Sequence, residues 1–509
     1  MNMGMEAAIT LQQCAAIQVA PADNVAVLLQ DASAGARISI GATTMSAAAA
    51  ICAGHKVALT NIEAGAPVIK YGAAIGRASS AISAGDWVHS HNLRTALTPG
   101  LAPPFAEQGQ KLAAPEAADA YRTFQGFRRA DGGVGTRNEI WVIATVGCVT
   151  RLCQRLAAEA MRCKPAGIDG VYALTHPFGC SQLGEDLDGA RVLLAALAAH
   201  PNAAGVLIVG LGCESNSIAG MLDALAPETR AKVRAFAAQD ETDELAAGLD
   251  ALEALLHDAT QAQRSVCPLS ALTIGLKCGG SDGFSGLTAN PLLGRAAERI
   301  TASGGGAILT EIPEIFGAEH VLLARARNDD VRQSANAMID DFKSYFVAHG
   351  QPISENPSPG NIAGGITTLE EKSLGAVQKS GASQLCETLR YGARKALPGL
   401  SLLESPGNDA VSSTALAAAG ANVILFTTGR GTPMGFPVPT IKVSSNSALA
   451  ARKPHWIDFD AGVLLGDAPP GRTTDRFLDF VLDVASGKRT KAEQAGEREI
   501  ALWKRGVTL

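Results

Sequence analysis

The chain has 509 residues, of which 47% are hydrophobic and 18% are charged, and its formal net charge is −6. This length exceeds one ordinary hydrophobic core, so we expect two to four domains. The basic residues are scattered along a net acidic chain, which gives no sign of a nucleic-acid surface. The most apolar stretches, such as Ala204–Leu211, are far shorter than the roughly 20 residues of a membrane-spanning helix. We therefore expect no nucleic-acid partner and no membrane partner.

The cysteine content bears on the cellular compartment. The first 18 residues carry no Lys or Arg ahead of a hydrophobic core, which argues against a secretory signal. Ten cysteines in such a chain fit a reducing compartment better than a disulfide framework. We expect a cytoplasmic protein in which any functional cysteine is a metal ligand or a reactive thiol.

Residues 19–95 predict a small all-β domain, preceded by an extension over residues 1–18. Its β-prone segments are separated by turns that contain glycine, such as Ala53-Gly54-His55. These segments are Val25–Leu29, Val57–Leu59, Pro67–Tyr71 and Trp87–His91. Residues 96–125 contain four prolines among Ala, Gly and Gln, a composition that predicts a linker.

From Asn138 onward, apolar strands, glycine-rich turns and Ala/Leu-rich helical stretches alternate. This alternation is typical of βαβ units and a mostly parallel sheet. The strand candidates are Ile140–Thr145, Val171–Leu174, Gly205–Val209, Leu272–Leu276, Ala307–Leu309 and Val423–Phe426. A break near residues 261–268 predicts two α/β domains, one over residues 126–265 and one over residues 266–509.

Cysteines gather where these strands end. In open α/β sheets, ligands bind just beyond the carboxyl ends of the strands. Cys148, Cys180, Cys213 and Cys278 lie at such ends, and the first three are about one βαβ unit apart. Thiolates on neighbouring strand ends can converge on iron, an iron–sulfur cluster or zinc. The alternative is that these cysteines are small hydrophobic residues near strand ends, which is a common role.

Two glycine-rich strand ends have different interpretations. Gly210-Leu211-Gly212 lacks the third glycine of the dinucleotide fingerprint, so we expect no nicotinamide site. Gly429-Arg430-Gly431-Thr432-Pro433 predicts an anion cradle, in which backbone N–H groups and the guanidinium hold a carboxylate. The alternative for this second segment is a tight turn with a surface arginine.

Other polar segments suit a sugar acid or a metal. The loop Asn356–Gly365 contains two prolines and two Asn amides, whose donors and acceptors suit hydroxyl groups. His89 and His91 lie on the same face of a β-prone segment, and His176 lies four residues before Cys180. The alternatives are an ordinary long connection for the loop and exposed, non-functional side chains for the histidines.

Several multi-residue motifs run from about residue 19 to the end of the chain. They are Gly54-His55-Lys56, Val68–Gly72, Thr145–Val149, Gly179–Gly184, Gly210–Glu214, Cys278–Asp282, Thr288–Pro291, Asn356–Asn361, Thr428–Pro433 and His455–Asp460. In these motifs the chain resembles the altronate/galactarate dehydratase family over almost its full length. His89–Asn92, His455–Asp460 and the terminal Gly506–Leu509 favour the altronate branch over the galactarate branch.

The resemblance implies a fold, a reaction and a cofactor. It implies a β-clip (SAF-like) first domain, an α/β middle domain used in dimer contacts, and a Rossmann-like C-terminal domain. The implied enzyme is a homodimeric hydro-lyase that converts D-altronate into 2-keto-3-deoxy-D-gluconate. It depends on iron under reducing conditions, with Mn²⁺ as a substitute. The alternatives are galactarate or another sugar acid as substrate, a sulfolactate-type lyase reaction, and a sugar-acid-binding protein without catalysis.

We expect the metal at the strand ends. Cys148, Cys180 and Cys278 are the leading iron ligands, and a shared [4Fe–4S] cluster with one open iron is a variant of this arrangement. The competing arrangement is a single Fe²⁺ with oxygen and imidazole ligands such as Asp282, Glu311, His89 and His91.

Dehydration of an aldonate removes the proton at C2, beside the carboxylate, and the hydroxyl at C3. A cation on the carboxylate stabilises the developing charge, and a metal assists the departing hydroxyl. We expect Arg430 to bind the carboxylate, so that its replacement by Ala raises KM. The other expected substrate contacts are Thr432, Asn356, Asn361 and Ser281. The expected catalytic side chains are Glu311 and, as the base, His91 or His176, because imidazole titrates near the working pH.

Overall fold

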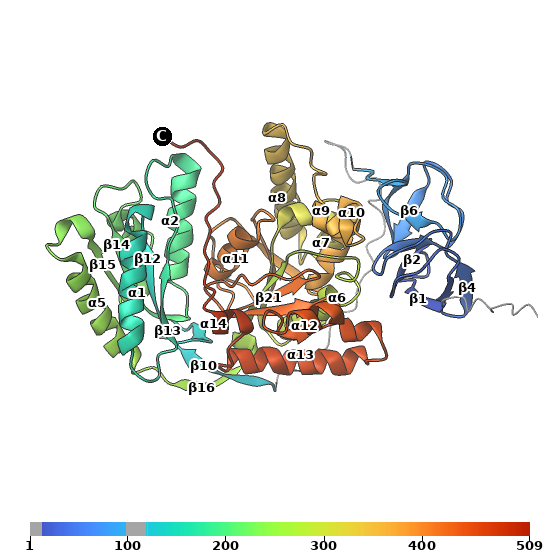
Figure 1. Cartoon of the computed structure of the whole chain (residues 1–509). Coiled ribbons are helices and arrows are strands. Elements are labelled where there is room, and N and C mark those ends of the chain that lie inside the picture. Colours follow the sequence, from blue (N-terminus) through green and yellow to red (C-terminus); the bar gives the residue numbers. More distant parts are fainter. Residues whose placement is uncertain (1–12, 98–118, 120) are drawn as a thin grey trace, which may run out of the picture.

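The computed structural model describes residues 13–97, 119 and 121–509, which form three parts (Figure 1). The N-terminal β module (residues 13–97) lies at one end of the molecule and the middle domain (residues 121–268) at the other. The C-terminal domain (residues 269–509) lies between them. The predicted linker falls mostly on residues 98–118, which lie outside the described residues.

The N-terminal β module contains two sheets, with strand orders β4-β3-β1-β2-β5-β8 and β6-β7-β9. The strands are β1 Gln13–Ile17, β2 Val25–Leu28, β3 Arg37–Ile40, β4 Thr43–Ser46, β5 Lys56–Ala58, β6 Pro67–Lys70, β7 Ala73–Ala78, β8 Trp87–Val88 and β9 Leu93–Arg94. Burial alternates along β1, as a strand with one face on a core requires. The prediction of a small all-β first domain is confirmed, although β1 begins before the predicted boundary at residue 19.

The middle domain is built on a four-stranded parallel sheet of order β13-β12-β14-β15. A three-stranded antiparallel sheet, β11-β10-β16, adjoins it. The strands are β10 Thr123–Arg128, β11 Val134–Gly135, β12 Glu139–Ala144, β13 Gly170–Leu174, β14 Ala203–Gly210, β15 Val233–Ala237 and β16 Arg264–Pro268. The helices are η1 Gly147–Val149, α1 Thr150–Cys163, α2 Gly184–Ala198, α3 Ile218–Asp223, α4 Pro227–Arg230, η2 Ala238–Asp240 and α5 Glu244–Ala259. Every residue of β12 is buried, which is typical of a central parallel strand.

The C-terminal domain contains a seven-stranded parallel sheet of order β19-β20-β18-β17-β21-β22-β23. The strands are β17 Thr273–Cys278, β18 Gly306–Leu309, β19 Leu385–Leu389, β20 Gly399–Leu403, β21 Val423–Thr428, β22 Thr440–Ser444 and β23 Phe459–Asp460. The helices are η3 Leu269–Ala271, α6 Ala289–Ala302, η4 Ile312–Glu314, α7 Glu319–Leu323, α8 Asp329–Ala348, α9 Pro359–Ala363, α10 Leu369–Ala376, η5 Val377–Ser380, α11 Asp409–Ala418, α12 Ser447–Arg452, η6 Gly462–Leu465, α13 Pro470–Ala485 and α14 Lys491–Ala495. The predicted parallel sheets are confirmed.

The strand order of this sheet reverses between β17 and β21. From β17 the chain passes to the adjacent β18 and then to the edge strand β19. It returns to β20, between β19 and β18, and crosses to β21 on the other side of β17. The loops that leave β17 and β21 therefore depart to opposite sides and leave a crevice at the carboxyl edge. Ligands bind in such crevices in open α/β sheets.

A buried carboxylate joins the N-terminal β module to the C-terminal domain. Glu371 in α10 accepts hydrogen bonds from Lys56 and Lys70, each with Nζ 2.8 Å from a carboxylate oxygen. All three side chains are at most 1% exposed. Burial alone would raise the pKa of Glu371, but the two ammonium groups outweigh burial and hold it far below its usual range. Glu371 is therefore ionised and binds two strands of the module at once.

Glycines allow the module to approach the C-terminal domain closely. A Cβ atom at Gly283 would lie 1.9 Å from the carbonyl oxygen of Gly54, and one at Gly365 would lie 2.5 Å from the same oxygen. No side chain fits at such distances. The contact continues at the end of α9, where the His55 and His89 rings donate to backbone carbonyls. The described part of the chain contains no helix that is long and apolar enough to cross a membrane.

Replacing Glu371 by Gln should destabilise the protein by about 3–5 kcal/mol, because it leaves two buried ammonium groups without a counter-charge. The free energy of unfolding is measured by urea denaturation with tryptophan fluorescence, which includes Trp87 of the module. The matched control is Glu253→Gln on the exposed side of α5, which should change stability by no more than about 0.5 kcal/mol. Equal losses in the two variants would contradict the role of Glu371.

Candidate active site at the carboxyl ends of β17 and β21

A pocket of about 550 Å³ lies at the crevice where the strand order reverses. Its volume falls in the range of small-molecule sites. Its lining residues come from the end of β17, from the segments after β17, β18, β20 and β21, from α9 and the loop before it, and from α10. They are Cys278, Gly279, Gly280, Ser281, Glu314, Asn356, Ser358, Asn361, Lys372, Gly407, Asn408, Asp409, Ala410 and Met434. Two other pockets, of about 480 and 570 Å³, have no cysteine and no lysine among their lining residues.

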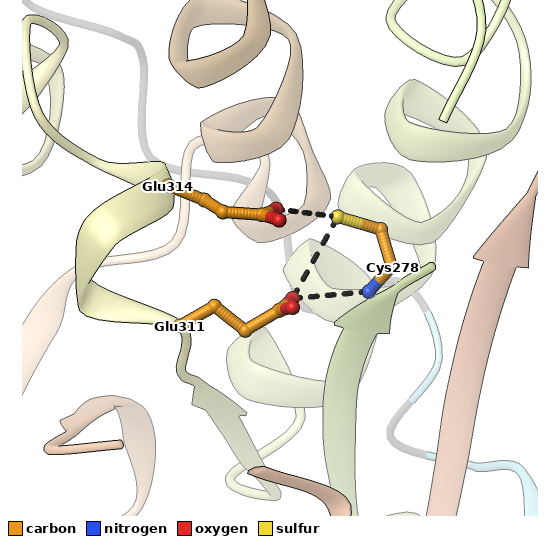
Figure 2. Close-up of side chains that lie close together, drawn as sticks. All are labelled: Cys278, Glu311 and Glu314. Atoms are coloured by element: carbon orange, nitrogen blue, oxygen red, sulfur yellow. Dashed lines mark hydrogen bonds between the residues drawn. The ribbon is translucent and has the colours of Figure 1, made fainter. Parts of the chain in front are cut away.

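A thiol and two carboxylates meet at the base of this pocket (Figure 2). Cys278 Sγ lies 2.9 Å from Glu314 Oε2 and 3.6 Å from Glu311 Oε2. The Cys278 backbone N–H donates to Glu311 Oε2 at 3.1 Å. Within the described residues, this is the one group of three His, Cys, Asp or Glu side chains whose ligand atoms all lie within 4.8 Å of one another.

Neighbouring strands bring these groups together. Cys278 is the last residue of β17, and Glu311 follows the end of the adjacent strand β18 by two residues. Glu311 has a φ of 68°, a left-handed conformation that is uncommon for residues other than glycine. This sharp turn starts η4, which directs Glu314 back toward the same sulfur. Such backbone conformations cluster at functional sites.

Three lysines surround the acidic groups. Lys379 Nζ lies 2.7 Å from Cys278 Sγ and 3.2 Å from Glu311 Oε2. Lys277 Nζ donates to Glu311 and, at 2.8 Å, to Asp409 Oδ1. Lys372 Nζ donates to Glu314 Oε1 at 2.9 Å and to Asn356 Oδ1 at 3.1 Å. The three ammonium groups and the three carboxylates of this cluster balance each other in charge.

The charge balance leaves the thiol protonated. Burial, together with the carboxylates of Glu311 and Glu314, raises the pKa of Cys278. Its S–H donates to Glu314 while its sulfur accepts from Lys379. Burial alone would raise the pKa of Glu314, but the neighbouring ammonium groups, with Lys372 first, lower it to about 2. Burial opposes the charge on Lys372, yet Glu314 raises the pKa of this ammonium group above its usual value.

The donor types of the cluster suit iron. One thiolate and two carboxylates within 4.8 Å match a divalent ion such as Fe²⁺ in kind and spacing. Metal ligands must be deprotonated, and the three ammonium groups already neutralise the carboxylates. The residues match iron in donor type and spacing, but an ion could bind only if the Cys278 thiol lost its proton and the ammonium groups left the ligand atoms that they now contact.

The predicted substrate-binding residues divide into two groups. Ser281, Asn356 and Asn361 line the pocket. The Asn361 amide is already used, because it caps α9 and donates to the Ser281 carbonyl at 2.8 Å. Arg430 and Thr432 are not among the lining residues. Arg430 is exposed, and its side chain lies beside Gly280 and Gly360, so its guanidinium lies at the rim.

The structure does not bring the other predicted oxygen and imidazole ligands to this cluster. Asp282 accepts from Ser285 at 2.8 Å and Ser445 at 2.7 Å through one oxygen, and from Asn446 at 3.0 Å through the other. The three donors therefore already engage both oxygens of this carboxylate. His89 belongs to the N-terminal β module, where Nε2 lies 3.1 Å from the Ile362 carbonyl and Nδ1 lies 3.0 Å from Ser90 Oγ.

Neither predicted basic histidine lines the pocket. His91 is exposed in the N-terminal β module and packs against the Trp87 ring. His176 is buried in the middle domain, where Nε2 contacts the Ala144 carbonyl at 3.0 Å and Nδ1 accepts from the Phe178 N–H. Burial lowers the pKa of His176 to about 4, so this imidazole is neutral and both its nitrogens are engaged.

The predicted iron ligands lie in two different sheets. Cys278 ends β17 and is buried, whereas Cys148 and Cys180 are exposed at the edge of the middle sheet. Neither exposed cysteine joins the group formed by Cys278, Glu311 and Glu314. Cys278 therefore lies in a different sheet from Cys148 and Cys180, with which it was predicted to share one cluster.

Sequence reasoning missed the lysines and gave Asp409, which it placed at a strand end, no role. One signal was present for Lys277, a charged residue inside the apolar run Thr273–Cys278 that forms a buried strand. A lysine in such a strand is rarely buried without a partner. Lys372 and Lys379 carried no such signal, because they lie on or after a short helix far along the chain from Cys278.

Three family models match consecutive parts of the chain. The altronate/galactarate dehydratase SAF domain matches residues 14–96, the D-galactarate dehydratase/altronate hydrolase second domain matches residues 126–260, and the D-galactarate/altronate dehydratase C-terminal domain matches residues 269–508. The chain is 46% identical over 495 residues to the altronate dehydratase of Escherichia coli (strain K12), covering 97% of this chain and 99% of that protein. The chain belongs to the altronate/galactarate dehydratase family.

Other members of this dehydratase family are also similar over nearly their whole length. The altronate dehydratase of Bacillus subtilis (strain 168) is 45% identical over 500 residues, with 97% of this chain and 99% of that protein covered. The galactarate dehydratase (L-threo-forming) of Escherichia coli (strain K12) is 34% identical over 501 residues, with 94% of each chain covered. The family resemblance inferred from the motifs is confirmed.

Cys278 should react with iodoacetamide more slowly than the exposed cysteines Cys148 and Cys163. Its raised pKa and burial make its alkylation at least about a hundredfold slower than that of exposed Cys148 or Cys163. Peptide mapping by mass spectrometry after timed alkylation measures each rate. Alkylation in denaturant is the control and should remove the difference. Early labelling of Cys278 in the native protein would contradict a neutral thiol held under the pocket.

Proposed function

We propose that this protein removes water from D-altronate and forms 2-keto-3-deoxy-D-gluconate. The observation that carries the proposal is the pocket at the carboxyl ends of β17 and β21, which combines an ammonium group, amides and a half-exposed carboxylate over a buried thiol. Membership of a dehydratase family supports the reaction class. The chain is 46% and 45% identical to two altronate dehydratases but 34% identical to a galactarate dehydratase, and this difference supports altronate as the substrate.

Lys372 is the cation best placed for the substrate carboxylate. An ammonium group has three N–H donors, and Glu314 and Asn356 accept two of them. The third donor is left for a ligand in the pocket, which Lys372 lines. Removal of the C2 proton spreads a second negative charge onto the carboxylate oxygens, and a fixed ammonium group stabilises that charge.

Asp409 is the carboxylate best placed to accept the C2 proton. Its Oδ1 accepts from Lys277, and its side chain is 37% exposed where it lines the pocket. Glu314, by contrast, accepts from Lys372 and Cys278 through its two oxygens and has a pKa of about 2. Asp409 then gives the proton that it took from C2 to the departing C3 hydroxyl, which leaves as water. The resulting enol loses the proton of its C2 hydroxyl and gains one at C3, which yields the 2-keto acid.

We also propose that the enzyme uses iron, with Cys278, Glu311 and Glu314 as the residues that would hold it. A bound iron ion would supply a Lewis acid that assists the departing hydroxyl. The pocket residues alone bind the acid, orient it and move its C2 proton.

The proposal is tested by anaerobic turnover of D-altronate with added Fe²⁺ and detection of the 2-keto-3-deoxy acid. Product that disappears on chelation and returns with Fe²⁺ supports the proposal. Galactarate is the second candidate substrate, because a diacid would place its second carboxylate near Arg430 at the rim. Product from galactarate and none from altronate would show that galactarate is the substrate and altronate is not. No product from any sugar acid would refute the dehydratase proposal.

Lys372→Met should raise KM for altronate by about 10- to 100-fold, because it removes a charge-assisted hydrogen bond worth about 1.5–3 kcal/mol. Arg430→Ala should raise KM by less than about fivefold, since an exposed cation at the rim contributes little. Circular dichroism confirms that each variant is folded. If Arg430→Ala raised KM more than Lys372→Met did, the substrate carboxylate would be bound by Arg430 and not by Lys372.

Asp409→Asn should lower kcat by about 10²- to 10⁴-fold while KM changes little, because the amide keeps the shape of the carboxylate but cannot accept the proton. The matched control is Asp467→Asn, an exposed residue in the loop before α13, which should leave kcat unchanged. A kcat near that of the unmodified enzyme would show that Asp409 is not the base.

A further inference from the structure

The loops that carry Cys148, Cys180 and Cys213 lie side by side at the carboxyl edge of the middle sheet, outside the pocket described above. Cys148 lies in η1 directly after β12, Cys180 follows β13, and Cys213 follows β14. The strand order is β13-β12-β14 and both pairings are parallel, so the three carboxyl ends are neighbours. All three side chains are exposed and none forms a disulfide.

Backbone hydrogen bonds tie the three loops to each other. The Gly147 N–H donates to the Phe178 carbonyl at 2.8 Å, which joins the Cys148 and Cys180 loops. The Asn216 N–H donates to the Gly179 carbonyl at 3.0 Å, which joins the Cys180 and Cys213 loops. The Asn216 side chain also donates to the Thr145 carbonyl at 3.1 Å. The three loops therefore form one packed unit.

A glycine precedes each of these cysteines, and the packing requires it. A Cβ atom at Gly179, which has a φ of +102°, would lie 2.1 Å from the Thr145 carbonyl oxygen. One at Gly147 would lie 3.0 Å from the Pro177 backbone, and one at Gly212, with a φ of +125°, would lie 2.8 Å from the Gln239 side chain. The backbones approach so closely that the cysteine positions are fixed relative to one another.

Two helices have their N-termini at this edge. α1 and α2, of 14 and 15 residues, both begin here, and neither has a side-chain cap on its first N–H groups. Helix N-termini carry partial positive charge and stabilise thiolates and other anions. Glu214 is turned inward, where it accepts from Thr145 Oγ1 at 2.6 Å and from the Gly212 N–H at 2.7 Å. The two acids in the first turn of α2, Glu185 and Asp186, are paired with Arg505 and Lys504 respectively.

We propose that Cys148, Cys180 and Cys213 bind a [4Fe–4S] cluster through three of its irons and leave the fourth iron without a cysteine ligand. A single ion does not fit, because within the described residues these sulfurs belong to no group of three ligand atoms within 4.8 Å of one another. The ligands of a cluster attach to different irons and stand farther apart. Ligation releases three thiol protons.

The cysteine ligands of this proposed cluster differ from those that the sequence analysis expected. Cys213 takes the place of Cys278, which is buried in another sheet beside Lys379. The exposed edge leaves the fourth iron accessible to an oxygen ligand, such as water or the hydroxyl or carboxylate of a small molecule. The inference does not depend on the proposed substrate, because its readout is the cluster itself and not turnover.

The test is anaerobic reconstitution of the full-length protein with Fe²⁺ and sulfide, followed by assays of iron, acid-labile sulfide and visible absorbance. The variants are Cys148→Ser, Cys180→Ser and Cys213→Ser, with Cys163→Ser as an exposed control and Cys278→Ser as the control for the pocket. Circular dichroism of each apo protein checks the fold, which an exposed Cys→Ser change should preserve.

We expect labile sulfide in the unmodified protein, in Cys163→Ser and in Cys278→Ser, and at least a tenfold loss in each of the three edge variants. Three results would overturn the proposal: iron without labile sulfide in the unmodified protein, full sulfide content in a folded Cys213→Ser variant, or loss of sulfide in Cys278→Ser. A failure of altronate turnover would affect none of these readouts, so the two proposals fail separately.

Discussion

The Glu371 carboxylate, held between the ammonium groups of Lys56 and Lys70, is the interaction on which the geometry of the pocket depends. Glu371 lies in α10, and the next residue, Lys372, lines the pocket. A buried, ionised carboxylate cannot leave its two partners without a large cost. The N-terminal β module thus fixes the position of α10, although none of its own residues lines the pocket. This explains how a separate β module affects chemistry at the end of a parallel sheet.

A second buried network, beneath the pocket, sets the protonation of the reacting groups. Three ammonium groups and three carboxylates balance each other around Cys278, so in this structure the thiol is neutral and Lys372 is charged. Because these charges are fixed before a substrate arrives, they stabilise developing negative charge without reorganisation. The left-handed backbone of Glu311 is part of this arrangement, since it lets Glu311 and Glu314 reach one sulfur.

Sequence patterns predicted the ends of strands better than the partners of side chains. Cys278 and Glu311 were both predicted at strand ends, and they meet because β17 and β18 are adjacent parallel strands. Lys379 was missed, since its contact with Cys278 spans 101 residues and follows no periodic pattern. His89 and His176 were chosen for their chemistry, but a sequence does not show that backbone groups engage their ring nitrogens. The β module was predicted from its β-prone segments and the glycine-containing turns between them, while the ion pairs that attach it were not predicted.

The most direct test of the account is a crystal structure of the enzyme, grown anaerobically, with 2-keto-3-deoxy-D-gluconate bound. The account predicts the product carboxylate within hydrogen-bonding distance of Lys372 Nζ and Asn356, with its C2 and C3 atoms facing Asp409. Product bound instead in the pocket beside Trp503 and Arg505, or at the edge that carries Cys148, would contradict the placement of the active site at the ends of β17 and β21.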